Sequence, residues 1–144
     1  MDKSKYDILK LENQLCFPLY AVSKEIIKRY NPILEKLSLT YTQYIAMLVL
    51  WQHGSVSVKE LGKRLFLDSG TLTPVLKSLE KKGYIIKTRL KKDERVVVAS
   101  LTVAGEKLKD EAITVPQEIA SCMNLEENEV SSLYDTLYKI LASN

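Results

Sequence analysis

Two cysteines, Cys16 and Cys122, are the side chains of this sequence best suited to covalent chemistry. A cysteine reacts as a thiolate, and an ordinary thiol with a pKa of about 8.5 is only a few per cent ionised at neutral pH. A single histidine, His53, and two widely separated cysteines do not supply the ligands of a zinc site. We therefore expect no metal and no other cofactor, and thiols that are either inert or redox-active.

Length and composition narrow the class of protein that carries these thiols. The chain has 144 residues, of which 46% are hydrophobic and 27% charged, as in an ordinary globular domain. Its longest apolar run, from Tyr44 to Trp51, is far shorter than the roughly 20 residues that cross a bilayer. The charged first residues are not followed by the apolar stretch of a secretion signal. We expect a cytoplasmic protein without a membrane partner, in which thiols stay reduced.

Positive charge is concentrated in one segment of the chain. Residues 59–95 contain eleven lysines and arginines against five acidic residues, a local charge of +6, whereas the whole chain carries +3. Clustered cations release counterions from phosphates, which a surface of mixed charge does far less. The segment is either an ordinary lysine-rich surface or a face that binds a polyanion, and its internal pattern favours the second interpretation.

The first part of this basic segment has the pattern of a helix-turn-helix. Ser57 and Glu60 form a predicted capping box before one short helix, and a polar turn leads to a second helix. Apolar residues recur at helical spacing over residues 72–79 of the second helix, and with Thr71 as its N-cap, Pro74 lies in its first turn. Small polar and basic side chains on its exposed face suit the major groove of DNA, namely Ser69, Thr71, Thr73 and Lys77.

Two β-prone runs, residues 84–89 and 95–101, follow the second helix and flank a charged tip. A hairpin directly after a helix-turn-helix is a wing, which can follow the DNA backbone or enter the minor groove. The tip lysines would attract phosphates, and an ion pair would orient the wing arginine. The side chains assigned to DNA in this wing are Lys91, Lys92, Asp93 and Arg95. The alternative is a plain surface hairpin, but the motif, the wing and the charge coincide, so we predict DNA binding.

Amphipathic helices precede the helix-turn-helix. The first spans about residues 11–30 and either begins near Cys16 or is kinked by Pro18. Asn31 and Pro32 are expected to end it, before a short second helix. Thr40 is the predicted N-cap of the helix that follows.

Further helices follow the wing. Thr102 is expected to cap a long helix that continues to Pro116, and a last helix begins at about Leu125. The apolar stripes of the first and last helices exceed what one small domain can cover, which predicts a two-fold homodimer. Such a dimer would hold two recognition helices roughly 34–36 Å apart on a pseudo-palindromic double-stranded DNA operator. The alternative is a monomer that hides the stripes internally.

Four short blocks make the sequence familiar: residues 13–17 (NQLCF), 39–44 (LTYTQY), 66–74 (FLDSGTLTP) and 92–95 (KDER). Together with the order of helices, helix-turn-helix, wing and helices, they resemble the MarR family of bacterial winged-helix repressors. Within that family they are similar to the organic hydroperoxide resistance regulators (OhrR) and their staphylococcal relatives. The Gln-Leu-Cys-Phe motif is the specific part, because a winged helix alone would not separate OhrR from other MarR proteins.

The resemblance implies a repressor whose Cys16 is oxidised by organic hydroperoxide and which then releases its operator. It also implies that Tyr30 and Tyr41 reach the sensing cysteine of the partner subunit and hydrogen-bond it. If Pro18 lies in a first helical turn, Cys16 stands at a helix N-terminus, which favours the thiolate. Many family members carry an apolar or small residue in place of Pro18. The alternative for Cys16 is a small buried side chain on an apolar stripe.

The resemblance gives Cys122 two readings. It lies near the end of the penultimate helix, where two-cysteine members of the family carry a resolving thiol. In that case the sulfenic acid of Cys16 condenses with Cys122 of the partner subunit. Otherwise Cys122 is inert, and a low-molecular-weight thiol caps Cys16.

The expected fold is mainly α with a small β-hairpin wing, in a single MarR-type chain over residues 1–144. Residues 40–101 form the winged helix-turn-helix, and residues 7–38 and 102–144 form the helical dimerisation region. Two other functions stay open: a MarR-type repressor that senses a small aromatic ligand, and a thiol peroxidase that uses Cys16. The basic segment and the lack of a Cys-x-x-Cys motif count against the peroxidase, so we expect no enzyme.

Overall fold

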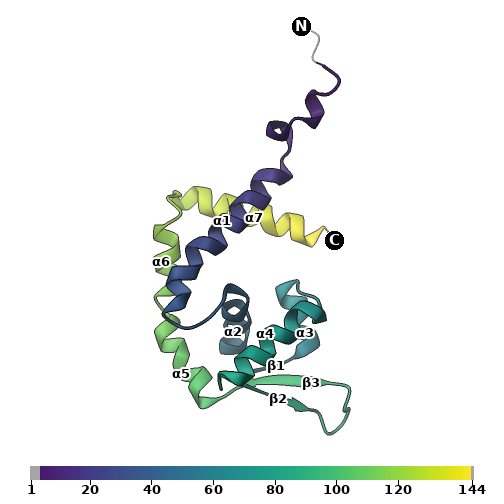
Figure 1. Cartoon of the computed structure of the whole chain (residues 1–144), viewed down its shortest axis with the longest axis vertical. Helices are drawn as coiled ribbons and strands as arrows, with labels where there is room; N and C mark the ends of the chain where they lie inside the picture. Colours follow the sequence, from purple (N-terminus) through teal and green to yellow (C-terminus); the bar gives the residue numbers. More distant parts are fainter. Residues whose placement is uncertain (1–3, 144) are drawn as a thin grey trace.

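A winged-helix unit and a set of longer helices make up the computed structural model, which describes residues 4–143 (Figure 1). The predicted fold class, mainly α with a small β wing, is confirmed. The elements of the described residues, in chain order, are two 3-10 turns η1 (Asp7–Leu9) and η2 (Leu11–Asn13), α1 (Cys16–Glu35), α2 (Tyr41–His53), β1 (Ser55–Ser57), α3 (Val58–Leu65), α4 (Ser69–Lys81), β2 (Ile85–Arg89), β3 (Val97–Leu101), α5 (Val103–Ala112), α6 (Val115–Ser121) and α7 (Glu127–Ala142).

Three helices begin at the N-caps that the sequence predicts. The side chains of Thr40, Ser57 and Thr102 each accept a hydrogen bond from the backbone N–H three residues later, at the starts of α2, α3 and α5. At α2 the cap is a complete capping box, because the Gln43 side chain accepts from the Thr40 backbone in return. The box predicted for α3 is only half formed, since the Glu60 carboxylate pairs instead with Arg64 at 3.2 Å.

The expected break at Asn31 and Pro32 is wrong. Helix α1 runs without interruption through Pro32, which lies in its last turns and removes only one helical N–H donor. The burial of Leu34 in the core holds this end of the helix in place. At the other end the sequence left two alternatives, and α1 begins at Cys16. Pro18 is therefore the third helical residue, where its missing N–H costs nothing.

Two other boundaries differ from the sequence prediction. The long helix expected from Thr102 to Pro116 is divided at Ile113 and Thr114 into α5 and α6, and Pro116 stands in the first turn of α6. The last helix, α7, begins two residues later than expected, at Glu127. These corrections turn one long helix into two shorter ones, of which α6 lies along α1 and α5 packs against α2 and β3 (Figure 1).

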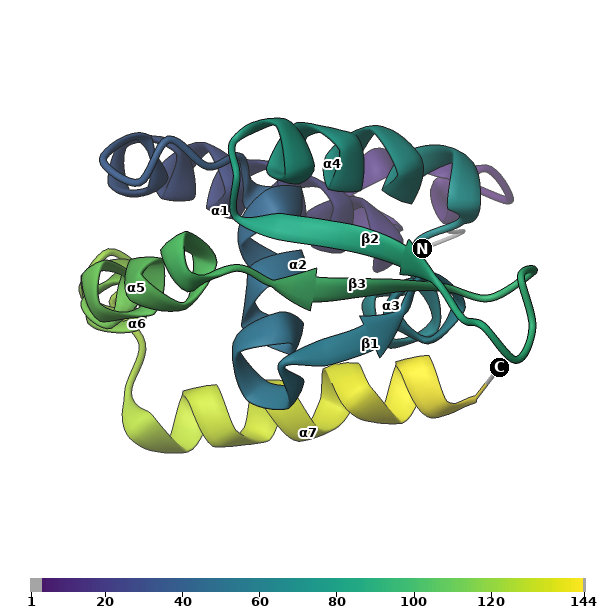
Figure 2. The same ribbon diagram turned by 90° about the horizontal axis from the view of Figure 1, so that it is seen from below.

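The predicted hairpin is present and belongs to a three-stranded antiparallel sheet in the order β1-β3-β2. Ile85 pairs with Leu101 and Arg89 with Val97 across the hairpin, so both strands lie within the runs predicted for them. The third strand, β1, pairs along the other edge of β3 and was not predicted. Figure 2 shows the sheet beside α4, with the hairpin tip extending beyond it.

The hydrophobic core lies within the winged-helix unit and continues to α5 and α6. Leu50 of α2, Leu61 of α3 and the leucines of α4 are almost fully buried there, together with Met47, Ile85 and Ala99. Helix α1 contributes only Leu34 to the buried residues, and α7 contributes none within the described chain. The large apolar side chains of α1 and α7 are instead exposed: Leu19, Val22, Ile27, Val130, Leu133, Leu137, Ile140 and Leu141.

A close backbone contact fixes α5 to the base of the wing. A Cβ atom at Gly105 would lie 2.1 Å from the carbonyl oxygen of Tyr84, so only glycine fits in this position. The Thr102 hydroxyl donates to the Gly83 carbonyl at 2.6 Å, and the Trp51 indole N–H donates to the Gly105 carbonyl at 2.8 Å. Helices α2 and α5 and the start of β2 are thereby held together.

Candidate functional site

Helix α4 presents one polar face and buries the other. Its leucines Leu72, Leu76 and Leu79 are buried in the core, whereas the four side chains predicted to face DNA are exposed. These are Ser69, Thr71, Thr73 and Lys77. The hydroxyl of Thr73 donates to the carbonyl of Ser69 at 2.7 Å, which leaves its oxygen lone pairs free to accept a hydrogen bond.

The start of α4 differs from the prediction that Thr71 is its N-cap. Asp68 is the N-cap, and its carboxylate accepts a hydrogen bond from the Thr71 backbone N–H at 2.7 Å. This bond holds the pKa of Asp68 below its ordinary value. Because the helix begins three residues earlier than expected, Pro74 lies beyond its first turn. The exposed carbonyl of Gly70 therefore lacks the helical N–H that another residue at position 74 would supply.

A groove of about 720 Å³ lies between α3, α4 and the wing. Three side chains predicted to contact DNA line this groove, namely Ser69, Thr73 and Arg95. Four further cations line the same groove: Lys59, Lys63, Lys87 and Arg89. None of the described residues that line it is acidic. The sequence predicted these four cations only as part of the +6 segment and not as residues of a DNA-binding site. No local sequence pattern indicates that α3 and the wing share a surface.

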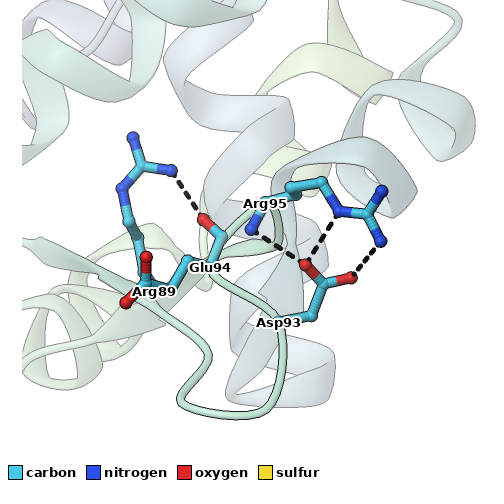
Figure 3. A network of polar contacts seen from close by, with 4 residues as sticks. All are labelled: Arg89, Asp93, Glu94 and Arg95. Carbon is cyan, nitrogen blue, oxygen red and sulfur yellow. Dashed lines mark hydrogen bonds and ion pairs between the residues drawn. The ribbon is translucent and has the colours of Figure 1, made fainter.

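The wing has an ordered polar network at its tip (Figure 3). The Asp93 carboxylate accepts from Arg95 Nε at 3.0 Å, from Nη2 at 3.2 Å and from the backbone N–H at 3.1 Å. These bonds lower the pKa of Asp93. The predicted pairing of the two residues is present, and it orients a guanidinium whose side chain is 91% exposed. Arg89 donates to the Glu94 carbonyl at 2.8 Å and closes the loop, with Lys91 and Lys92 exposed beside it.

Cys16 is the first residue of α1, and its side chain is exposed. The N–H groups of a first helical turn have no helical acceptor, so the start of α1 carries a positive field beside this side chain. The segment before it is folded rather than extended: the Asn13 amide donates to the Asp7 carbonyl at 2.6 Å, and the Gln14 amide donates to the Ile8 carbonyl at 2.7 Å. The turns η1 and η2 and the start of α1 project away from the core in Figure 1.

Cys122 directly follows α6 and is also an exposed free thiol. Its Sγ–H donates to the Glu118 carbonyl at 3.3 Å, and its own carbonyl accepts from Arg29 Nη1 of α1 at 2.8 Å. The predicted position near the end of the penultimate helix is correct. The two cysteines are not bonded to each other within this chain.

Tyr30 and Tyr41 lie together, with ring centroids 4.8 Å apart, and Tyr44 lies 5.9 Å from Tyr30. Burial raises the pKa of Tyr30 to about 12, helped by the neighbouring phenols, and burial also raises the pKa of Tyr41. Both phenols are thus protonated at neutral pH and can donate O–H hydrogen bonds. No hydrogen bond joins either tyrosine to Cys16 among the described residues of this chain, and the contact to the cysteine of the partner subunit stays a prediction.

Two other kinds of site are not found in the described residues. Among residues 4–143 there is no group of three or more His, Cys, Asp or Glu side chains that could hold a metal ion. No helix in this range is both long and apolar enough to cross a membrane.

Comparison with known proteins identifies the family. Residues 28–112 match the family described as "Transcriptional regulator SarA/Rot". The "Organic hydroperoxide resistance transcriptional regulator" of Bacillus subtilis is 47% identical over 139 residues, which are 96% of this chain and 95% of that protein. The blocks that resemble OhrR in the sequence are therefore matched by a relative of that name.

Solved structures of AbfR, a protein of Staphylococcus epidermidis, are similar over nearly the whole chain. Reduced AbfR bound to DNA has a TM-score of 0.77 at 34% identity, covering 94% of this chain and 96% of AbfR. The disulfide form of AbfR has a TM-score of 0.64 at 33% identity, with 96% and 94% coverage. The chain belongs to the SarA/Rot family of transcriptional regulators and is a MarR-type winged-helix regulator of the organic hydroperoxide resistance type.

Proposed function

We propose that the chain is a cytoplasmic homodimeric repressor that releases its DNA operator when an organic hydroperoxide oxidises Cys16. The observation that carries the DNA-binding part is the groove between α3, α4 and the wing, with its five cationic side chains. A duplex carries closely spaced phosphates, so such a surface gains affinity by releasing their counterions. AbfR, which has the same fold, was solved on DNA.

In this proposal the DNA-binding part is residues 40–101. The exposed face of α4 enters the major groove with Ser69, Thr71, Thr73 and Lys77, where the free lone pairs of the Thr73 oxygen can accept from a base edge. Arg95 enters the adjacent minor groove, in the orientation that Asp93 sets. Lys91 and Lys92 contact phosphates beside it.

The dimerisation region is residues 7–38 and 102–144. The exposed apolar side chains of α1 and α7 are the surface that a second copy covers, because a single chain leaves them in water. To bind two half-sites of a duplex, such a two-fold dimer has to hold its two α4 helices roughly 34–36 Å apart, one turn of DNA. A pseudo-palindromic operator follows from that symmetry.

The sensing step is a nucleophilic substitution at oxygen. The Cys16 thiolate attacks the peroxide, an S–O bond forms as the O–O bond breaks, and the alcohol leaves with a proton. Sulfur is oxidised by two electrons and the peroxide is reduced. The helix N-terminus at Cys16, together with O–H donors from Tyr30 and Tyr41 of the partner subunit, stabilises the thiolate. In this proposal the oxidised thiol acts on DNA binding and not on turnover of the peroxide, so the chain is a regulator and not an enzyme.

Cys122 completes the chemistry in one of two ways. If the Cys122 thiol of the partner subunit attacks the sulfenic acid, a disulfide forms and water leaves. If it does not, a low-molecular-weight thiol makes the same exchange. The exposure of Cys122 supports the first course, and a relative of the same fold was solved in a disulfide form.

The test is DNA binding to the promoter fragment upstream of the protein's own gene, at fixed salt, before and after stoichiometric cumene hydroperoxide. Intact-mass analysis of the same samples identifies the product. We expect binding to be lost together with oxidation of Cys16, and Cys16→Ser to bind DNA and to ignore the peroxide. Binding that persists with oxidised Cys16 refutes the proposal, and release by salicylate alone would support the aromatic-ligand alternative.

In the same assay, Cys122→Ser identifies the resolving thiol. If Cys122 resolves, this variant should lose the linked dimer and form a mixed disulfide with added thiol. An unchanged linked dimer would exclude Cys122 from the chemistry.

A further inference from the structure

One polar side chain is buried where the first turn of α2 meets the C-terminal end of α4. Gln43 is 6% exposed and is the sole polar residue among the buried ones of the described chain. Its carbonyl oxygen accepts from the Thr40 backbone N–H at 3.1 Å and from Lys82 Nζ at 2.9 Å, and its amide donates to Ser78 Oγ at 3.0 Å. Burying an amide is costly unless it is hydrogen-bonded, so Gln43 can be buried here only because these partners bind its polar atoms.

The partners of Gln43 belong to two different parts of the structure. Thr40 lies at the junction of α1 and α2, whereas Ser78 and Lys82 lie at the C-terminal end of α4. Lys82 also donates to the carbonyl of Ser38, a residue with φ of +55° in the turn that follows α1. The end of α4 is thus tied by hydrogen bonds to the turn between α1 and α2.

Each end of this connection reaches a functional side chain. Tyr41 lies between Thr40 and Gln43 in sequence, and the centroid of its ring is 4.8 Å from that of Tyr30 in α1. On the other side, Lys77 directly precedes Ser78, and the exposed polar face of α4 continues from it toward the groove. The connection therefore joins the tyrosine pair to the helix that faces DNA.

Hydrogen bonds can transmit a movement of the tyrosine pair to α4 better than the contacts of the surrounding leucines can. Apolar side chains in a core tolerate small sliding movements, but a hydrogen bond weakens steeply when its length or angle changes. Gln43 is buried while its partners are partly exposed, so a movement of α4 against the turn would leave the buried amide without its hydrogen bonds, which is costly.

We propose that Gln43, Ser78 and Lys82 are positioning residues that couple the Tyr30–Tyr41 pair to the orientation of α4, and so to DNA affinity. We call these three residues the polar joint. The proposal rests on the proposed redox function in one respect: oxidation of Cys16 is the signal that would move the tyrosines. The coupling itself is a property of the folded chain and can be measured without peroxide.

The main variant is Lys82→Met, which keeps the length of the side chain and removes its hydrogen bonds to Ser38 and Gln43. Lys81→Met is the matched control, because it removes the same charge from the neighbouring exposed residue, which makes no side-chain hydrogen bond among the described residues. Gln43 itself is left unchanged, since its loss would threaten folding. Circular dichroism and solution mass verify that both variants are folded dimers.

The peroxide-free arm is a double-mutant cycle with Tyr41→Ala, read as the Kd for the promoter fragment. We expect Tyr41→Ala to weaken DNA binding in the parent protein and in Lys81→Met. In Lys82→Met the same substitution should have an effect smaller by about threefold or more. Additive effects, or no effect of Tyr41→Ala in the parent, overturn the polar joint.

The second arm measures the Kd for the promoter fragment with oxidised and with reduced protein, and compares the ratio of the two values between Lys82→Met and the parent protein. Lys82→Met should lower this ratio by about threefold or more, while the rate of Cys16 oxidation stays unchanged. A merely structural role would lower stability in both states and leave the ratio unchanged, so an unchanged ratio in a responsive protein also overturns the proposal. A wild-type protein that ignores peroxide but shows coupling in the cycle refutes the redox function and supports the polar joint.

Discussion

Replacing Gly105 by alanine tests how α5 is attached to the base of the wing. The added methyl group would lie 2.1 Å from the Tyr84 carbonyl oxygen and 3.1 Å from Leu101 Cδ2. The nearer atom belongs to the backbone and accepts a hydrogen bond from the Thr102 N–H at 3.1 Å, so it cannot rotate away as a side chain would. Helix α5 has to move, and its Gly105 carbonyl then retreats from the Trp51 indole N–H.

The magnitude follows from two contributions. Overpacking a well-packed site costs about 1–3 kcal/mol, and a weakened buried hydrogen bond costs about 1 kcal/mol more. We therefore expect Gly105→Ala to lower the free energy of unfolding by about 2–4 kcal/mol. The reduced protein should also bind DNA more weakly, because the wing loses the support of α5.

Urea unfolding at a fixed protein concentration measures this change. Trp51 is the single tryptophan of the chain and donates to the substituted residue, so its fluorescence reports on the site directly. Gly70→Ala is the control: its Cβ would meet only Asp68 Oδ1 at 3.5 Å, and alanine in α4 should stabilise by up to about 1 kcal/mol. A Gly105→Ala protein within about 0.5 kcal/mol of the parent would refute this account of the contact.

Three further outcomes are expected. Arg95→Ala should weaken operator binding by the reduced protein by about tenfold or more, as measured by fluorescence anisotropy at fixed salt, and an unchanged Kd would contradict the wing assignment. Asp68→Ala should lower the melting temperature at neutral pH. Because the folded pKa of Asp68 is depressed, its contribution is present above the ordinary value of 3.8 and is lost as the pH falls below it, so melting curves of the two proteins should converge in acid. Tyr30→Phe should slow the oxidation of Cys16 by cumene hydroperoxide about tenfold, the effect of one hydrogen bond to a thiolate; an equal rate in stopped-flow measurements would remove Tyr30 from the sensing site.

Local signals in the sequence were sufficient where a feature involves neighbouring residues. Thr40, Ser57 and Thr102 cap helices because a side chain and an N–H three residues later decide a helix start. The pairing of Asp93 with Arg95 is equally local. The start of α4 was misjudged because several capping residues stand in a row, and the choice among them depends on how α3 ends.

Features that depend on tertiary packing could not be predicted in this way. Strand β1 has only three residues and exists because β3 lies beside it. Lys59 of α3 and Arg89 of the wing share a groove although 30 positions separate them in sequence. Gln43 is recognisable as a capping residue of α2, but its bonds to α4 join residues 35 and 39 positions apart.

The uninterrupted course of α1 through Pro32 makes this helix a lever. Its 20 residues form a rod about 30 Å long, with Cys16 at the free end and Leu34 buried near the other end. For such a rod, a displacement of about 5 Å at the thiol corresponds to a tilt of only about 10° at the core. Because a large displacement at Cys16 gives only a small tilt at the core, one oxygen atom added to the sulfur changes the orientation of α1 little. We expect a mixed disulfide or a cross-linked dimer, which supplies several ångströms of travel, to release DNA more completely than the sulfenic acid does.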